Sequence, residues 1–383
     1  MSDSDTQGLR ARCSQCVLPR SATTITFDDN GTCSLCNAAK AQSPTSGQPG
    51  CAAGDVEEHI QEIRKRGRGR RYDCVVGISG GRDSTYLLWL LVTKHHLRCL
   101  AAYYRTPFTP EVIDQNVRRL VTHLDVPLVE MDISQEYHLS IARRVVRLWL
   151  RHPHPAIANL ACGVCKFVNR EVYRIAQHEG VSSIIYGGTR FEVYQFGAVQ
   201  SPRAVAAHGN TGLHTLGAST RKMFRVVARG IGALSRSREL WRYLSIGVKS
   251  AVLYMNPHTP WLRFRYPGIH TLEYFHHTEW MEEEAEKSLR EVGWELPPGA
   301  NMTWRADCSF GELKNRMFAM MTGITYVDAY FSNMMRAGVL TREEGLRRLA
   351  TEGNPSPERL GDACRPLELD PVLFSDGNLD KAK

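Results

Sequence analysis

The sequence predicts an α/β protein built on a doubly wound parallel sheet, with a small cysteine-rich module before it and a helical region after it. Residues 73–78 form an apolar run that leads through a glycine turn into an apolar segment at 85–92. The same alternation of short apolar runs and amphipathic segments recurs downstream, which is typical of a parallel sheet covered by helices. Four N-terminal cysteines are spaced as two pairs, which indicates a separate metal-binding module.

The later elements of the sheet can be placed in order. Apolar runs at 97–104, 127–131 and 182–186 predict three further strands, and 110–124 predicts a helix that begins at a proline. Ligands of doubly wound sheets bind at the carboxyl ends of the strands. We therefore expect three segments to share one rim, at residues 79–84, 104–106 and 187–190.

Composition limits the classes of protein that fit. The 383 residues carry a formal net charge of +8, which suits an anionic small molecule or RNA without distinguishing them. No apolar run reaches the length of about 18 residues that a membrane span needs, and the first residues have no secretory apolar core. Eleven cysteines, an odd number in a chain of this size, favour reduced thiols and a cytoplasmic location.

The N-terminal cysteines have the spacing of a zinc ribbon. They form a C-x2-C-x16-C-x2-C pattern at Cys13, Cys16, Cys33 and Cys36. Each C-x-x-C places two sulfurs on one tight turn, and two such turns complete a tetrahedron around Zn²⁺. A strand and a turn at residues 29–31 would bring the two pairs together. The alternative is four unrelated buried thiols.

Residues 79–84, with the sequence SGGRDS, are expected to bind phosphate. Gly80 and Gly81 let the backbone approach an anion, and the helix that follows directs free N–H groups toward it. Asp83 can hold Mg²⁺ and Arg82 supplies a cation, while Ser79 and Ser84 add hydroxyl donors. The loop is not a Walker loop, because it lacks the G-x-x-x-x-G-K pattern.

This loop resembles the PP-loop of the N-type ATP pyrophosphatases, enzymes with a HUP-like fold. The resemblance implies cleavage of ATP between its α and β phosphates and adenylation of a substrate. Arg82 stands where the family often has lysine or a small residue. Arg190, on the same rim, is a candidate phosphate or substrate contact, with a solvated loop arginine as the alternative.

Three further cysteines have several interpretations. Cys162 and Cys165 form a C-x-x-C pair, and Cys308 lies far downstream. The pair could be a redox or sulfur-transfer dithiol, half of a second metal site, or two packing residues. Together the three thiols resemble the ligands of the [4Fe–4S] clusters of thiolating PP-loop enzymes, in which one open iron position could hold a sulfide.

The chain divides into five expected regions. These are a zinc-ribbon module at 1–50, a PP-loop domain at 57–200, a basic amphipathic insert at 201–270, a helical region at 271–353 and a polar tail at 354–383. Residues 221–250 of the insert carry eight basic side chains and one acidic one. A solvated helix face, a lid over the substrate and a membrane-surface helix all fit this pattern. The tail is expected to be loosely ordered.

Nearly the whole chain is similar to the N-acetyl sugar amidotransferase family of surface-polysaccharide biosynthesis. The similarity is carried by the C-x-x-C-V-L-P and I-T-F-D-D-N-G-x-C-x-x-C strings, by SGGRDST, by the second C-x-x-C, and by D-C-x-F and A-G-V-L-T-R-E-E. It implies that ATP adenylates the acetamido oxygen of a nucleotide-linked N-acetyl sugar and that ammonia then forms an amidine. A separate glutaminase partner would supply the ammonia.

The resemblance also implies roles for particular residues. Asp83, Arg82 and Arg190 are the expected catalytic residues, Tyr104 is expected near the adenine, and pyrophosphate is expected on Ser79, Gly80, Gly81, Asp83 and Ser84. ATP, Mg²⁺ and Zn²⁺ are the expected cofactors. The alternative function is ATP-dependent sulfur transfer to a tRNA base or small metabolite through Cys162, Cys165 and Cys308, with a possible [4Fe–4S] cluster. A zinc-ribbon binding protein with an inactive loop is a third hypothesis.

Overall fold

The computed structural model describes residues 12–22, 25–41, 53–192, 249, 253–254, 257–353 and 356–375. The predicted basic insert at 221–250 falls outside these residues, apart from Lys249. No helix in the described part of the chain is both long and apolar enough to span a bilayer.

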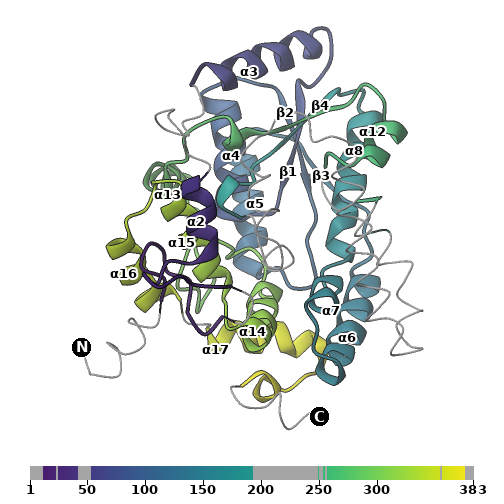
Figure 1. Cartoon of the computed structure of the whole chain (residues 1–383). Coiled ribbons are helices and arrows are strands. Elements are labelled where there is room, and N and C mark those ends of the chain that lie inside the picture. Colours follow the sequence, from purple (N-terminus) through teal and green to yellow (C-terminus); the bar gives the residue numbers. More distant parts are fainter. Residues whose placement is uncertain are drawn as a thin grey trace.

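The centre of the molecule is a five-stranded sheet in which all neighbouring strands are parallel (Figure 1). The strand order is β3-β2-β1-β4-β5. The strands are β1 Cys74–Ile78, β2 Cys99–Tyr103, β3 Leu128–Glu130, β4 Ser183–Tyr186 and β5 His270–Glu273. The chain order reverses between β1 and β4, the position at which doubly wound sheets bind their ligands.

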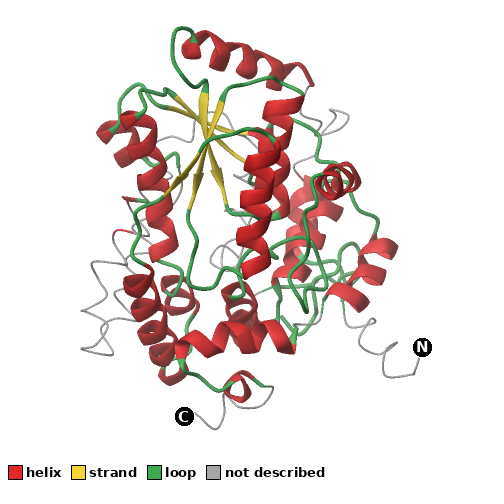
Figure 2. Ribbon diagram, turned by 180° about the vertical axis from the view of Figure 1, so that it is seen from behind, coloured by secondary structure: helices red, strands yellow, loops and turns green. Residues whose placement is uncertain are grey.

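Alternate residues of β1 face two different cores, because successive side chains of a strand point to opposite faces. Val76 and Ile78 belong to the larger core, which includes residues of α4 Arg82–Thr93 and α5 Glu111–His123. Val75 belongs to the second core, with residues of α8 Phe167–His178. Figure 2 shows helices on both sides of the sheet. The predicted doubly wound α/β fold is confirmed.

The remaining helices are α2 Ser34–Ala41, α3 Ala53–Gly67, α6 Gln135–Arg151, α7 Pro155–Leu160, α12 Pro260–Arg265, α13 Glu282–Glu291, α14 Phe310–Thr322, α15 Tyr326–Arg336, α16 Arg342–Glu352 and α17 Pro357–Cys364. In Figure 1, α3 lies above the sheet, α14 and α17 lie below it, and α13, α15 and α16 lie to its left.

Two parts of the fold differ from the expected division of the chain. Strand β5 pairs with β4 but was not predicted, because only Leu272 of its four residues is buried and the others are polar. The expected loose tail contains α17, in which Cys364 is fully buried, and Phe374, which is also fully buried. Arg359 of α17 donates to the carbonyl of Ala306 at 3.2 Å, so this segment supports the site described below.

Candidate active site

The glycine turn after β1 has a backbone conformation and close packing that require glycine. Gly80 has φ +81°, and a Cβ atom there would lie 2.6 Å from a methyl of Ile113. The indole of Trp294 donates to the Gly80 carbonyl at 2.9 Å, and the backbone N–H of Ser79 donates to Ser84 Oγ at 3.1 Å. Both serine hydroxyls therefore lie together at the start of α4, 3.2 Å apart.

Gly80→Ala is expected to lower the free energy of unfolding by about 1–3 kcal/mol, because alanine is strained at this φ and its methyl group overlaps Ile113. Chemical denaturation measures the effect. Gly311→Ala is the matched control, because a Cβ there meets no atom within 4 Å and helix α14 favours alanine. Equal unfolding free energies for the two variants would contradict the assigned conformation.

The N-terminus of α4 faces this turn. Gly81 precedes the helix, and no side chain caps it. The first N–H groups and the dipole of a helix attract anions. Gly187, in the loop after β4, lies so close that a Cβ there would be 3.0 Å from the Asp83 carbonyl. The loop at residues 79–84 and the loop after β4 are therefore in contact on one rim, as the sequence predicts.

Arg82, which was predicted to supply a cation at the phosphates, is buried and paired with protein groups. Its side chain is 1% exposed. Its guanidinium donates to Asp83 at 2.7 Å, to Tyr330 at 3.2 Å and to the carboxylate of Glu282. Burial opposes the charged form, but Asp83, Tyr330 and Glu282 hold the pKa of Arg82 well above its ordinary value. Arg82 therefore anchors the loop to the C-terminal helices.

Three carboxylates gather beside the loop, and only Asp83 among them was predicted. Asp83 Oδ2 is buried and has no hydrogen-bond partner among the described residues. Glu192 lies within electrostatic reach of Asp83 and Asp307, and a Cβ on Gly81 would be 3.2 Å from Asp307. Mg²⁺ in nucleotide sites binds one or two carboxylates together with phosphate oxygens. The orphaned oxygen of Asp83 fits that requirement, and Glu192 beside it could serve as a second ligand by losing its proton when Mg²⁺ binds.

Glu192 gives the site a pH dependence. Burial, together with Asp83 and Asp307, raises the pKa of Glu192 from 4.5 to about 8 despite the opposing charge of Arg305. Between these values the folded protein keeps a proton that the unfolded chain has lost, so stability falls as pH rises. Without Mg²⁺, Glu192→Gln should flatten the fall of the unfolding free energy between pH 4.5 and 8. The exposed Glu343→Gln control should not. Parallel curves for Glu192→Gln and wild type would contradict this assignment.

The loop after β4 continues into a short helix, η2 Arg190–Glu192, that carries two charged site residues. Arg190 lies over the ring of Phe191 and influences His276 electrostatically. Arg305 interacts with Glu192 at 3.6 Å and has φ +56°, a conformation uncommon for arginine. Backbone strain of this kind concentrates at functional sites. Glu192, Arg305 and Asp307 were not predicted from the sequence, although Asp307 begins the D-C-x-F string.

The structure places Tyr104, which was predicted to lie near the adenine, beside His138. The side chain is 7% exposed, and its hydroxyl lies 2.9 Å from His138 Nδ1. The other ring nitrogen of His138 lies 3.6 Å from Cys165 Sγ. Burial lowers the pKa of His138 to about 4, so the ring is neutral at pH 7. Tyr104 and His138 therefore orient Cys165.

Cys165 lies beside this histidine, and Cys162 and Cys308 lie within electrostatic reach of Cys165, although Cys308 is far away in the sequence. Burial and the two neighbouring thiols raise the pKa of Cys165 well above its ordinary value. Burial, with Asp307 and Cys162, raises the pKa of Cys308 to about 12. Their sulfurs are not gathered within 4.8 Å of one another, as the four N-terminal sulfurs are. That spacing does not suit one Zn²⁺ ion, whereas the ligands of an iron–sulfur cluster bind different iron atoms.

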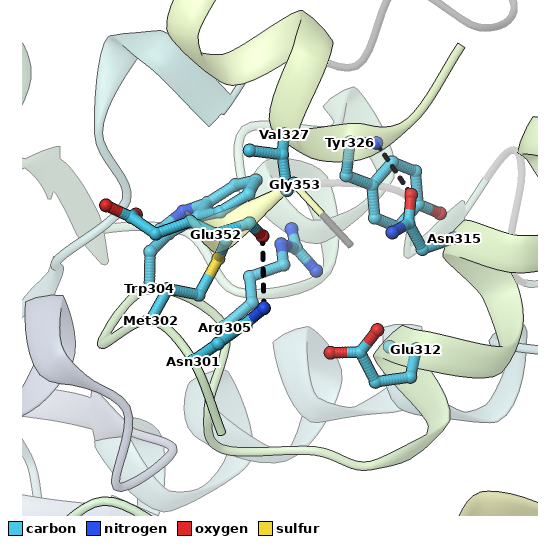
Figure 3. A pocket seen from close by; sticks show the side chains of 11 residues that line it. Asn301, Met302, Trp304, Arg305, Glu312, Asn315, Tyr326, Val327, Glu352 and Gly353 are labelled. Carbon is cyan, nitrogen blue, oxygen red and sulfur yellow. Dashed lines mark hydrogen bonds between the residues drawn. The ribbon is translucent and has the colours of Figure 1, made fainter. Parts of the chain in front are cut away.

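A hollow of about 390 Å³, open to solvent, borders the segment that carries Arg305. Figure 3 shows the side chains of Trp304, Arg305 and Tyr326 around it. Asn301 donates to the Glu352 carbonyl at 3.3 Å, and Asn315 accepts from the Tyr326 N–H at 2.7 Å. These bonds hold the wall of the hollow. None of its lining residues belongs to the PP-loop, so we assign it no ligand.

The N-terminal cysteines form the only group in the described residues whose three or more metal-ligating atoms all lie within 4.8 Å of one another. All four thiols are buried. Cys13 Sγ accepts the backbone N–H groups of Gln15 and Cys33 at 3.4 and 3.2 Å. The turn at residues 29–31 brings the two pairs together, with Gly31 at φ +72° and an antiparallel bridge from Phe27 to Cys33. Four sulfurs in this arrangement, here called the four-cysteine site, fit a tetrahedral metal ion.

Comparisons with known proteins give distant similarities. No family model matches the chain. An uncharacterized protein of Methanocaldococcus jannaschii is 26% identical over 134 residues, which are 35% of this chain. The chain spans 43% of that relative, less than half of its length.

Solved structures are also similar at low identity. The NMN synthetase of Francisella tularensis is 18% identical over 37% of this chain and 58% of its own, with a TM-score of 0.26. The NH3-dependent NAD synthetase of Campylobacter jejuni is 14% identical over 53% of this chain and 96% of its own, with a TM-score of 0.27. A tRNA thiolase of Methanococcus maripaludis with its [4Fe-4S] cluster is 11% identical over 96% of this chain and 92% of its own, with a TM-score of 0.33. The site is therefore assigned from the geometry of this chain.

Proposed function

We propose that this protein is an ATP-dependent amidotransferase that adenylates the acetamido oxygen of a nucleotide-linked N-acetyl sugar and replaces that oxygen with ammonia. One observation carries the ATP-dependent step. Asp83, in the first turn of α4 next to the glycine turn, has a buried carboxylate oxygen without a hydrogen-bond partner among the described residues. A metal-bound phosphate chain supplies the partners that such an oxygen lacks.

The chemistry follows from this arrangement. The acetamido oxygen attacks the α phosphorus of ATP, the bond to the bridging oxygen breaks, and pyrophosphate leaves. Ammonia then adds to the imidate carbon, loses a proton, and displaces AMP, which retains the former acetamido oxygen. Residues 79–84 hold the leaving pyrophosphate in line with the attack. Mg²⁺ bound to Asp83 and Glu192 would neutralise charge on the phosphates.

The remaining groups have defined parts in this proposal. In this proposal Arg190 and Arg305 supply positive charge to the reacting phosphates, which stabilises the charge that develops on oxygen. Zn²⁺ in the four-cysteine site is structural, because all four ligand positions are protein thiols. A separate glutaminase delivers the ammonia, and the anionic substrate agrees with the net charge of +8.

The test is a product assay with ATP, Mg²⁺, ammonium and a panel of nucleoside-diphosphate N-acetyl sugars. The proposal expects AMP and pyrophosphate in equal amounts, formed only when an acetamido sugar is present. The same sugars without the acetamido group are the matched control. AMP formation that does not depend on the acetamido group would contradict the proposal, as would ADP as the product.

Sulfur transfer to a tRNA base or small metabolite is the second candidate function. It is favoured by the electrostatic proximity of Cys162, Cys165 and Cys308, and by Asp307, which lies near both Cys308 and Gly81. Iron and acid-labile sulfide, measured after anaerobic purification, separate the two candidates. Zinc alone favours amidotransfer, whereas zinc with about four irons and matching sulfide favours sulfur transfer.

A further inference from the structure

Helix α15 lies between the four-cysteine site and the rim of the sheet. In Figure 1 the N-terminal segment, drawn in purple, lies beside α15 and α16. Residues of α15 contact both the cysteine module and the loop after β4. The helix begins at a complete capping box made by Thr325 and Asp328, so its first turn is fixed.

The module is attached to α15 by polar contacts. Asp328 accepts from Arg12 at 2.5 Å, and Ser332 Oγ accepts the backbone N–H of Val17 at 3.3 Å. Arg336 is the residue of this helix that touches the thiols themselves. One of its terminal nitrogens lies 3.7 Å from Cys16 Sγ and 3.9 Å from Cys36 Sγ. A cation thus stands beside one sulfur from each C-x-x-C pair.

The second terminal nitrogen of Arg336 extends the contact toward the sheet. It donates to Asn333 Oδ1 at 2.6 Å. The amide nitrogen of Asn333 in turn donates to the Phe191 carbonyl at 2.8 Å. Phe191 is the residue before Glu192, the carboxylate beside Asp83. Two side chains of one helix therefore connect the cysteine module to the loop that carries Glu192.

Helix α15 also reaches the PP-loop by a separate route. The hydroxyl of Tyr330 accepts from Arg82 at 3.2 Å, and its ring stacks on Trp304 with centroids 4.0 Å apart. Tyr330 is fully buried, so its position is determined by the packing of α15. A displacement of α15 would consequently move both the loop at residues 79–84 and the loop after β4.

We propose that Arg336 and Asn333 are positioning residues that couple the metal-bound four-cysteine site to the loop carrying Glu192. A dication held by four thiolates leaves two negative charges, and the guanidinium of Arg336 is placed to compensate one of them. With the metal in place, Cys16 and Cys36 hold Arg336, Arg336 holds Asn333, and Asn333 holds the carbonyl before Glu192. Substitution of groups that support metal ligands typically lowers metal affinity by about 10–100-fold.

The coupling is reciprocal: if bound metal stabilises the ordered loop, ordering of the loop increases the metal affinity by the same free energy. It depends on the proposed function only in the choice of ATP as the ligand that orders the loop. With Mg²⁺ and ATP bound, zinc should pass to a chelator several-fold more slowly. Without nucleotide, the coupling is still visible as protection of residues 187–192 from amide hydrogen exchange.

The test compares Arg336→Gln with Arg347→Gln, an exposed arginine of the neighbouring helix that pairs with Glu344 at 2.6 Å. Both variants are first shown to contain zinc. In zinc-loaded Arg336→Gln, residues 187–192 should exchange about 10-fold faster than in wild type, and zinc should be released about 10-fold faster. The Arg347→Gln protein should behave as wild type in both measurements.

Asn333→Ala provides the same test if Arg336→Gln does not fold. This variant keeps the contact of Arg336 with the thiols but loses the hydrogen bond to the Phe191 carbonyl. Amide hydrogen exchange at residues 187–192 should therefore be fast even with zinc bound, and zinc removal should accelerate it little further. Wild-type protection of this segment in zinc-loaded Arg336→Gln would overturn the proposal. So would an equal effect of zinc removal in Asn333→Ala and wild type. Failure of ATP to bind would contradict the proposed function alone, because the exchange experiment needs no nucleotide.

Discussion

Asp83→Asn is expected to reduce pyrophosphate release by about 100-fold or more, because the neutral amide loses the charge that binds Mg²⁺ at the phosphates. The folded structure should persist. The oxygen of the introduced amide can still accept the 2.7 Å hydrogen bond from Arg82, and Glu282 still pairs with that guanidinium. Steady-state assays of AMP and pyrophosphate, with acetamido sugar and ammonium, measure the loss.

Asp125→Asn is the matched control for this substitution. Asp125 is exposed in the turn before β3, at φ +51°, where asparagine is also tolerated. The control should retain wild-type activity and stability. If Asp83→Asn released pyrophosphate at the wild-type rate, the carboxylate would have no part in the reaction and the site would have to lie elsewhere.

Cys33→Ser is expected to abolish zinc binding and to lower the free energy of unfolding more than any other substitution proposed here. Cys33 is fully buried, lies 3.8 Å from Cys16 Sγ, and accepts the backbone N–H of Cys36. A structural zinc site contributes about 10–16 kcal/mol of apparent binding free energy in zinc-finger peptides, and that energy stabilises the fold. Metal analysis of the purified variant and thermal unfolding, each with and without chelator, measure the effect.

Cys364→Ser separates the loss of metal from the loss of a buried thiol. Cys364 is also fully buried, at the end of α17, but belongs to no metal-ligating group in the described residues. Its variant should lose some stability and keep its zinc. A Cys33→Ser protein with wild-type zinc content would contradict the assignment of the four-cysteine site.

Features confined to a short stretch of sequence were predicted well. The SGGRDS loop and the two N-terminal C-x-x-C pairs contain their own turn residues, so their local geometry follows from contiguous residues. The four predicted strands are present because each is a short, mainly apolar segment. Strand β5 lacks such a run and forms only because β4 supplies its partner.

Contacts between distant segments account for the other differences. Arg82 looked like a phosphate ligand from its place in the loop, but its carboxylate partner Glu282 is 200 residues away. Glu192 stands in a segment with no distinctive composition, and its proximity to Asp83 depends on the contact of Gly187 with the PP-loop. The roles of Asn333 and Arg336 likewise require the packing of α15 against both the cysteine module and the loop after β4.

The most direct test of the central claim follows the acetamido oxygen. A nucleoside-diphosphate N-acetyl sugar is prepared with a heavy oxygen isotope in its acetamido group and incubated with the protein, ATP, Mg²⁺ and ammonium. Mass spectrometry of the nucleotide products then shows where that oxygen goes. We predict AMP that carries one heavy oxygen on its phosphate, together with an amidine sugar that has lost it. Unlabelled AMP, or ADP, would contradict adenylation of the acetamido group.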